Sequence, residues 1–536
     1  MISKIDDFIT SKSASKILCI VILFLLLLGI KNRFIQDDAF ISFRYAQNFV
    51  QGHGLTWNIG EHKNIEGYTN FLWVIMIAFV EALGLDPVSS SMVLGILFAV
   101  GTLFFTYRLS LMLLQSRLVG LLTVILLGTN YSFSSYMTGG LETQLQSFLI
   151  VCSTYCTFCI IHRNKSLEFV GLSGLFSLAV MTRLDSALIC CVLYLFVLSS
   201  LFKTRIAINK KIVLLSSLTL PGLSIVGAWL FFKFFYYGDI LPNTYYVKAA
   251  DFSIETFLRG GWYVCSFFYN YFLIPFVLLG IIYFKKIFSQ SSMRVILVIM
   301  SLWLIYTIKV GGDFMEYRFL VPILPFMFLL ISNVLLLINN SIIQMALIIL
   351  VFVGSFFHAV TFNGSRGIES ISSLNSHIVS PSKDWRGVGI VLGEIFSNSV
   401  DPVTIAVTAA GAIPYYSKLP TIDMLGLNDK WVAINGIKIG TRPGHTKYTT
   451  LEYLIERDVN LLIGHPKVTL ISANPITNLK KYFWVPIDTS LLSEKTKVLE
   501  IPLNTRYKIQ ILYLKRHEYI DECIEKLNLK TYKITK

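Results

Sequence analysis

Long apolar segments recur through the first two thirds of the chain, and they decide what it can fold into. A run of about 20 apolar residues spans the hydrocarbon core of a bilayer as a helix. Since 54% of the residues are hydrophobic and the mean hydropathy is +0.64, the chain is predicted to be a polytopic α-helical membrane protein. About eleven spans are predicted, near 14–30, 90–114, 118–137, 144–162, 168–182, 186–202, 212–237, 262–284, 294–310, 319–338 and 342–360.

Basic residues gather at one set of span ends and set the predicted orientation. The clusters are Lys4/Lys12/Lys16, Arg163/Lys165, Lys203/Arg205/Lys210/Lys211 and Lys285/Lys286. The positive-inside rule makes these loops cytoplasmic, so the N-terminus is expected inside and the C-terminus outside. Residues 71–85 are apolar but short and contain Glu81, and a span there would move the later basic loops outside. They are predicted to form a juxtamembrane or re-entrant helix. The net charge of +14 is therefore mostly a topology signal and not a nucleic-acid surface.

The eight cysteines predict neither a disulfide framework nor a metal site. Seven lie in predicted spans, and Cys523 lies near the C-terminus. Cys152, Cys156 and Cys159 share one helix face, a pattern that fits small packing residues in lipid better than metal ligands.

The chain divides into a membrane domain, residues 1–360, and a soluble domain, residues 361–536, because Ser, Asn, Pro and charged residues become common after 361. Segments 403–409, 461–463, 498–501 and 508–514 are predicted strands. Segments 449–458, with Thr450 as N-cap, and 519–527 are predicted helices. Such alternation predicts an α/β or α+β domain. The turn-rich segments 410–417 and 442–447 carry groups that bind hydroxyls or anions, although a structural turn explains each equally well.

Unusual polar residues converge on the predicted outer side. That side holds the first loop, 31–89, the corners 139–143 and 182–185, the segments 238–261 and 311–318, and the soluble domain. The orientation comes from the basic clusters alone, so this convergence independently supports a single extracytoplasmic site.

Asp37 and Asp38 follow the first span and are the candidate catalytic residues. Ionisable residues at the edge of a helix bundle mark sites or substrate paths. Partial desolvation and a neighbouring acid both raise the pKa of a carboxylate towards the range that suits a general base. The structural alternative is that one of the two caps a helix over 39–50.

Two further groups of side chains suit a transferase that uses a lipid-phosphate sugar. Arginine holds phosphate in a fork, although snorkelling to lipid headgroups is the common alternative. The candidate donor-phosphate ligands are Arg44, Arg183, Lys248 and Arg318. The candidate sugar- or acceptor-binding residues are His53, Glu66, Tyr68, Glu142, Asp185, Asp313, Tyr415 and His445.

The chain resembles the GT-C superfamily of polyprenyl-phosphate-sugar-dependent glycosyltransferases. Within it, the likeness is greatest to cell-wall arabinofuranosyltransferases that cap arabinan with a terminal β-linked residue. The stretches that carry the resemblance are 37–46, 52–55, 66–69, 140–143, 311–315 with Arg318, 411–417 and 443–447. They cover almost the whole chain in the expected order. Corner 182–185 departs from the pattern, because relatives tend to have an Arg-Pro-acid sequence there.

The resemblance implies a GT-C fold, a decaprenyl- or undecaprenyl-phosphate sugar donor and Asp37 or Asp38 as base. It suggests arabinofuranose as the sugar. The multi-pass chain would lie in the bacterial inner membrane, with its site and C-terminal domain periplasmic. The chain is rich in Lys, Asn, Ile and Phe, unlike GC-rich actinobacterial proteins. The acceptor is therefore expected to be a surface glycan, lipopolysaccharide or pilin rather than arabinogalactan. No cofactor is required for a single-phosphate donor, while a divalent metal remains open.

Two other functions stay open from the sequence. One is a transferase of the same superfamily that moves mannose or aminoarabinose onto protein or lipid A. The other is a transporter or flippase for a lipid-linked glycan, although the spans lack central charges and an obvious inverted repeat. One outward pocket holding the acidic pair and Arg318 favours a transferase, whereas a polar path through the midplane favours transport.

Overall fold

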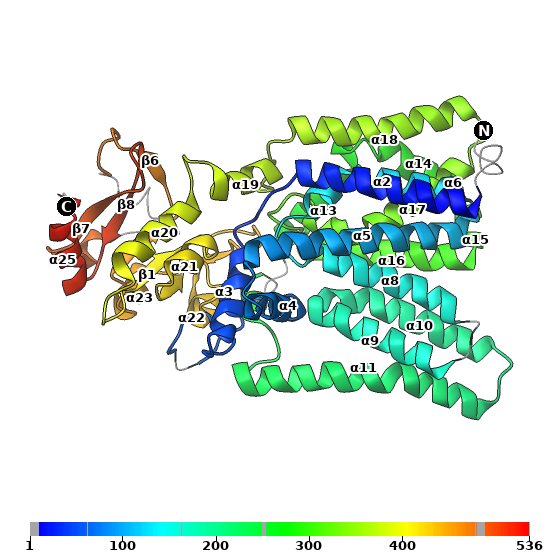
Figure 1. Cartoon of the computed structure of the whole chain (residues 1–536), viewed down its shortest axis with the longest axis horizontal. Coiled ribbons are helices and arrows are strands. Elements are labelled where there is room, and N and C mark those ends of the chain that lie inside the picture. The colour runs from blue at the N-terminus through cyan, green and yellow to red at the C-terminus, as the bar shows by residue number, and fades with distance from the viewer. Residues whose placement is uncertain are drawn as a thin grey trace.

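The computed structural model of the protein describes residues 10–61, 63–161, 163, 165–248, 253–476, 479 and 488–534. Two parts lie in line along its long axis (Figure 1): a bundle of long helices and, beyond one end of it, an α/β domain that carries the C-terminus. The predicted fold class, a polytopic helical membrane protein with a C-terminal α/β domain, is confirmed.

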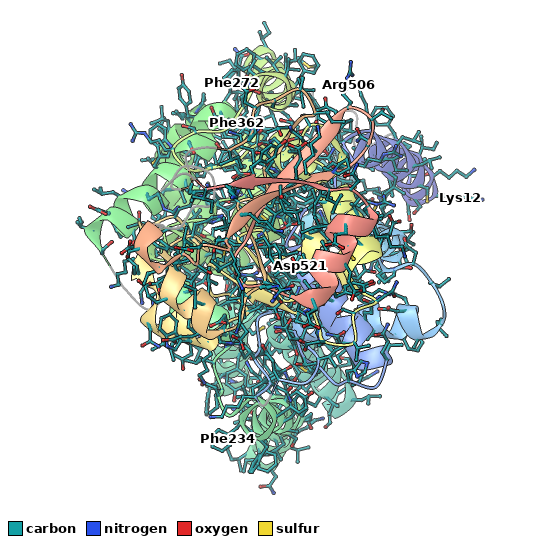
Figure 2. The ribbon with its side chains drawn as sticks, turned by 90° about the vertical axis from the view of Figure 1, so that its left-hand side faces the viewer. Lys12, Phe234, Phe272, Phe362, Arg506 and Asp521 are labelled. Carbon is teal, nitrogen blue, oxygen red and sulfur yellow. The ribbon has the colours of Figure 1, made fainter. Side chains whose placement is uncertain are left out.

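Eight helical segments among the described residues are long and apolar enough to cross a membrane. They are α2 (Ser11–Lys31), α5 (Pro87–Leu114), α8 (Thr143–Ile160), η1 with α10 (Leu184–Lys203), α11 (Ile208–Tyr237), α16 (Ser291–Lys309), η2 with α17 (Arg318–Leu336) and α18 (Ser341–Thr361). The segment Arg318–Leu336 is 83% buried, whereas α11 is 17% buried and lies at the edge of the bundle (Figure 1). Phe234 of α11 is exposed at the rim of the molecule (Figure 2), as suits a side chain that faces lipid.

The other predicted spans are helical but differ in form. Helices α6 (Arg117–Gly128) and α9 (Ser166–Thr182) are shorter apolar helices. The predicted span 262–284 is broken: α13 (Ile254–Asn270) and α14 (Ile274–Ile282) meet at 96°. Phe272 at the break has φ of +55°, and a proline lies in the first turn of α14. Both features interrupt a continuous helix.

Short helices fill the space between the bundle and the α/β domain. The first loop holds α3 (Ala39–Val50) and α4 (Phe71–Ala82), where the sequence predicted a helix over 39–50 and a juxtamembrane helix. The remaining short helices of the bundle and linker are α7 (Tyr131–Ser135), α12 (Asn243–Lys248), α15 (Phe284–Ser289) and α19 (Ile371–Val379).

The α/β domain is built on a mixed seven-stranded sheet with the order β2-β1-β5-β8-β7-β9, in which β6 also pairs with β8. The strands are β1 (Ile405–Val407), β2 (Thr421–Asp423), β5 (Leu461–Gly464), β6 (Val468–Leu470), β7 (Lys497–Pro502), β8 (Tyr507–Tyr513) and β9 (Lys530–Lys533). Strands β2, β1 and β5 run parallel, and the other pairs are antiparallel. A separate hairpin joins β3 (Ile437–Lys438) to β4 (Lys447–Tyr448).

Helices accompany this sheet, and two of them lie where the sequence predicted. They are α20 (Trp385–Phe396), α21 (Ala412–Ser417), α22 (Lys430–Asn435), α23 (Leu451–Glu456) and α25 (Glu518–Lys526), with the short turn η3 (Thr489–Leu491). The hydroxyl of Thr450 caps α23 by accepting the amide N–H of Tyr453, as predicted.

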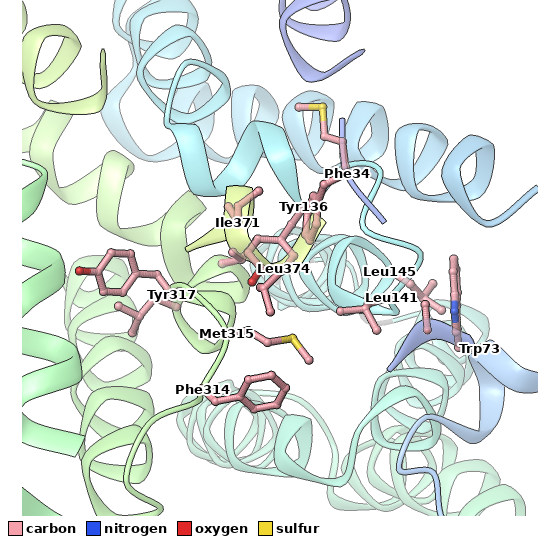
Figure 3. Close-up of a cluster of buried hydrophobic side chains, with 14 of the residues drawn as sticks. Phe34, Trp73, Tyr136, Leu141, Leu145, Phe314, Met315, Tyr317, Ile371 and Leu374 are labelled. Atoms are coloured by element: carbon pink, nitrogen blue, oxygen red, sulfur yellow. The ribbon is translucent and has the colours of Figure 1, made fainter. Parts of the chain in front are cut away.

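The largest of three hydrophobic core clusters among the described residues runs from the bundle into the α/β domain. Figure 3 shows where it crosses: Ile371 and Leu374 of α19 lie beside Tyr136 and Met315 of the bundle. All four side chains are buried. The α/β domain is therefore packed onto the end of the bundle, and this packing fixes the geometry between them.

Candidate active site

A cavity of about 210 Å³ lies where the loops of the bundle meet the α/β domain; we call it the membrane-side pocket. Its walls come from the first loop, from both polar corners, from the segments after α11 and α16, and from the α/β domain. Six of the residues predicted from sequence line it: Asp38, Tyr68, Glu142, Arg183, Asp185 and Arg318. Chain segments far apart in the sequence thus meet in one cavity.

Arg183 holds the two polar corners together. Its guanidinium contacts Oε1 of Glu142 at 2.9 Å and Oδ2 of Asp185 at 2.6 Å. Asn70 donates a further hydrogen bond to Glu142, and Gln146 donates one to Asp185, at 2.9 and 2.8 Å. With all three guanidinium nitrogens bonded to carboxylates, Arg183 shapes the wall of the pocket.

Arg318 is bonded differently and is the better anion ligand. Its Nε donates to Oδ2 of Asp313 at 2.7 Å, and within the described part of the chain this is its only hydrogen bond. Its two terminal nitrogens therefore keep their donors for the pocket that Arg318 lines. The ring of Phe319 lies 5.2 Å from the guanidinium of Arg183 and 5.5 Å from that of Arg318, which restrains both cations.

The two adjacent aspartates have different surroundings. The carboxylate of Asp37 accepts the amide N–H groups of Gly411 and Ala412, at 3.1 and 2.8 Å, and so bonds the start of α21. The pKa of Asp37 is raised to about 7, mainly by burial, and the negative charges of Asp38 and Asp423 act in the same direction. The two hydrogen bonds from backbone amides lower the pKa and oppose this shift in part. Asp38 precedes α3, but its side chain makes no capping hydrogen bond there. It is less buried than Asp37 and lines the membrane-side pocket.

Asp38 also lines a second cavity, of about 170 Å³, which lies between the first loop and the α/β domain; we call it the interdomain pocket. Ile41 and Leu427 likewise line both cavities, so the two pockets meet at Asp38. Asp37 and His445 line the interdomain pocket and do not line the membrane-side pocket. The predicted candidates thus divide between two adjoining cavities.

Arg44, a predicted ligand of the donor phosphate, does not line the membrane-side pocket. It donates to the carbonyls of Trp57, Pro414 and Leu419 and to the side chain of Asn58. Its guanidinium also lies 4.6 Å from the centre of the Trp57 ring. Arg44 thus ties α3 and the first loop to the α/β domain, and its donors are already used.

Three other candidates lie away from both pockets. His53 is exposed on the surface of the first loop. Tyr415 is buried and packs against Phe40, with ring centres 5.5 Å apart. Glu66 pairs with Lys233 at 2.9 Å, and both side chains are buried. Tyr415 and Glu66 thus make packing and ion-pair contacts, and the contact of the three residues with sugar stays a prediction.

Asp313 and Lys248 complete the set of candidates. Asp313 does not line the membrane-side pocket, but its carboxylate accepts the hydrogen bond from Nε of Arg318 and so orients the guanidinium. Lys248 ends α12, and its side chain lies outside the described part of the structure.

The sequence reading missed two groups of residues. Lys233 is a lysine inside an apolar span, and its only sequence signal was that a charge there needs a partner. The second group lines the interdomain pocket and comprises Glu369, His377, Trp385 and His465. No motif joins these residues, because they come from the segment before α19, from α19 and α20, and from the loop after β5. Among the described residues, no cluster of three or more His, Cys, Asp or Glu side chains is arranged to hold a metal ion.

Residues 382–512, most of the α/β domain, match a family described as a domain of unknown function (DUF8728). No curated protein matches the sequence at a significant level.

Several solved structures are similar in fold. ArnT from Cupriavidus metallidurans bound to undecaprenyl phosphate is 12% identical with a TM-score of 0.48, over 77% of this chain and 86% of that one. The same protein in the apo state is 11% identical with a TM-score of 0.49, over 93% of this chain and 98% of that one. An Archaeoglobus fulgidus oligosaccharyltransferase in complex with Zn and sulfate is 10% identical with a TM-score of 0.47, over 91% of this chain and 72% of that one.

Proposed function

We propose that this chain is a membrane glycosyltransferase that moves a sugar from a polyprenyl-phosphate donor to an acceptor hydroxyl. The observation that carries the proposal is that Asp38 and Arg318 line one cavity at the end of an apolar helix bundle. A carboxylate for the acceptor and a cation for the leaving phosphate are the two charges that this reaction needs.

Arg318 is assigned to the donor phosphate. Its terminal nitrogens form a fork that matches two phosphate oxygens, and Asp313 fixes the orientation of that fork. Nearby, Leu241, Val310 and Phe319 give the cavity an apolar side, which suits the first units of a polyprenyl chain. Arg183 contributes positive potential but few free donors, since its nitrogens already bond Glu142 and Asp185.

Asp38 is assigned as the general base. It accepts the proton of the acceptor hydroxyl while that oxygen forms a bond to the anomeric carbon of the donor sugar. The bond from the anomeric carbon to the phosphate oxygen breaks, and the polyprenyl phosphate leaves with the electron pair. Arg318 stabilises the charge that develops on the leaving group. Asp37 holds α21 in place and keeps a second ionisable group beside the base.

The proposed sugar and orientation are supported by the sequence. The resemblance to terminal arabinofuranosyltransferases supports arabinofuranose as donor sugar, with mannose and aminoarabinose as the alternatives. The basic loops support an extracytoplasmic site in the bacterial inner membrane. On this orientation the acceptor is an envelope glycan, lipid or protein that reaches the outer face.

The test is transfer from synthetic polyprenyl-phosphate-[14C]arabinofuranose by the purified chain in detergent, with the mannose and aminoarabinose donors run in parallel. We expect turnover with one of the three donors and its loss in the Asp38→Asn variant. Turnover with mannose or aminoarabinose alone would exclude arabinofuranose. An absence of turnover and of hydrolysis with all three donors would refute the proposal and favour a transporter.

A further inference from the structure

The two cavities that meet at Asp38 divide the reaction between them. Arg318 lines the membrane-side pocket and does not line the interdomain pocket. A base that takes a proton from the acceptor must touch the acceptor, and a cation that holds the leaving phosphate must touch the donor. The acceptor hydroxyl therefore approaches Asp38 from the side opposite Arg318, which is the interdomain pocket.

The sheet of the α/β domain ends at this same pocket. Thr408 follows β1, Leu425 follows β2 and His465 follows β5, and all three residues line the cavity. The three strands are parallel, with β1 between the other two. The chain leaves β1 for β2 on one side and later returns to β5 on the other side. Ligands of open α/β sheets bind in such a crevice, outside the carboxyl ends of the strands where the strand order reverses.

The wall of the interdomain pocket is aromatic and polar. The ring of His377 stacks on Trp385, with centres 4.2 Å apart and planes 17° apart, and His465 meets Trp385 edge-on at 5.8 Å. The hydroxyl of Thr408 lies 3.3 Å from Nδ1 of His465. Burial lowers the pKa of His465 to about 4, so its imidazole is neutral at pH 7. Aromatic faces beside neutral hydrogen-bonding groups suit a sugar ring.

The charges of this pocket disfavour an anionic ligand. Arg442 is the sole lysine or arginine among the described residues that line it, and its guanidinium contacts Glu369. His377 contacts the other oxygen of Glu369 at 3.1 Å. Although burial opposes it, hydrogen bonds from His377 and Arg442 lower the pKa of Glu369 to about 2. The carboxyl groups of Asp37, Asp38 and Glu369 outnumber the one guanidinium in this wall, which disfavours a phosphate or carboxylate ligand.

We propose that the interdomain pocket binds the terminal, uncharged sugar residue of a glycan acceptor and presents one of its hydroxyls to Asp38. This inference rests on the proposed function. The volume of about 170 Å³ is several times the ~30 Å³ that one water occupies in the liquid, which suits a single sugar ring. Thr408 and His465 bond hydroxyls of that ring, and Trp385 packs against its apolar face. The Arg442–Glu369 pair closes the pocket.

The experiment compares acceptors that differ in one charge. The full chain in nanodiscs receives the donor that it consumes, together with octyl glucoside, octyl galactoside or octyl mannoside, or with octyl glucuronide as the anionic twin. We expect neutral glycosides to accept sugar with a kcat/KM at least about tenfold above that of the glucuronide. Saturation-transfer NMR with the corresponding methyl glycosides measures binding without any turnover.

Two conservative variants locate the site. Thr408→Val and His465→Gln should each raise the KM for the neutral acceptor about tenfold, the effect of one lost hydrogen bond. They should leave the KM for the donor unchanged, because neither residue lines the membrane-side pocket. Thr469→Val in β6, away from both pockets, is the matched control and should behave as the native chain.

Each possible result decides between the two proposals. If the chain consumes donor but neutral glycosides neither bind nor accept sugar, the acceptor assignment fails and the transferase stands. The assignment is also overturned if octyl glucuronide accepts sugar with a kcat/KM equal to or above that of the neutral glycosides. It is likewise overturned if the two variants change the KM for the donor instead of the KM for the acceptor. If no donor is consumed, the transferase fails, and the NMR binding of methyl glycosides still decides whether this pocket holds a neutral sugar.

Discussion

The ammonium Nζ of Lys233 lies 2.9 Å from Oε2 of Glu66, and both side chains are almost wholly shielded from solvent. Lys233 lies near the end of the apolar helix α11, and Glu66 lies in the first loop. The hydroxyls of Tyr68 and Tyr237 form a second link between the same two elements, at 2.9 Å. The pair anchors the first loop to a helix that is otherwise little buried.

Removing one partner of this pair should destabilise the chain strongly. Glu66→Gln or Lys233→Met leaves an uncompensated buried charge, which costs about 3–5 kcal/mol. The double variant removes both charges and should recover much of that loss. Thermal unfolding in detergent measures the three variants. If the double variant loses the sum of the two single losses, the pair is not coupled.

Asp38→Asn should abolish transfer without unfolding the chain. Loss of a general base lowers the rate by about 10²–10⁴-fold, whereas donor binding by Arg318 should persist. Asp37→Asn is the matched control and should retain more activity, because Asp37 is bonded to the backbone of α21. Initial rates and donor binding at pH 7 distinguish the two. A larger rate loss in Asp37→Asn would transfer the role of base to Asp37.

Arg318→Lys should weaken the use of donor. A lysine keeps the charge but loses the fork of donors, so we expect the kcat/KM for the donor to fall about 10–100-fold. Arg44→Lys should instead lower the temperature of unfolding, because Arg44 bonds the α/β domain. Its donor KM should stay at the native value. If Arg44→Lys raised the donor KM and Arg318→Lys did not weaken the use of donor, the phosphate ligand would be Arg44 and not Arg318.

The stability of the chain should fall as Asp37 ionises. Its pKa rises from 3.8 to about 7 on folding, mainly through burial, so the folded chain favours the protonated form. This contribution is therefore fully present below about pH 4 and is lost as the pH rises through about 7. The unfolding temperature in detergent should decline more steeply over this range in the native chain than in Asp37→Asn. Parallel declines would show that Asp37 does not cause the effect.

Gly411→Ala should disturb the contact between the first loop and α21. A Cβ at Gly411 would lie 1.9 Å from the carbonyl oxygen of Asp37, a distance that requires the backbone to move. We expect lower activity and a lower unfolding temperature. Gly440→Ala is the control, because nothing lies within 4 Å of its added Cβ. Unchanged activity in Gly411→Ala would mean that the contact is not needed.

Hydropathy and turn chemistry predicted much of the fold from sequence. The apolar runs identified the long helices, and Thr450 identified the start of α23. The break at Phe272 was missed because the apolar run of the predicted span 262–284 continues through it. Strand β2 is only three residues long, too short for an alternation pattern, and α20 has no strong capping signal besides Asp384.

The candidate site was predictable in its local motifs but not in its pairings. Asp38, Glu142, Arg183 and Arg318 stood out as charges at the ends of apolar spans. Arg44 had the same sequence signal, yet it bonds carbonyls of the α/β domain. Which arginine keeps free donors depends on contacts between residues that are hundreds of positions apart. A single sequence does not contain that information.

The start of α21 touches Asp37, and the carboxyl ends of β1, β2 and β5 line the cavity next to Asp38. The soluble domain is therefore not an independent module that could be exchanged among related chains. A chimera that grafts the α/β domain of one relative onto the helix bundle of another would inherit mismatched halves of the candidate active site. Compatible swaps would have to carry the first loop together with the domain that it meets.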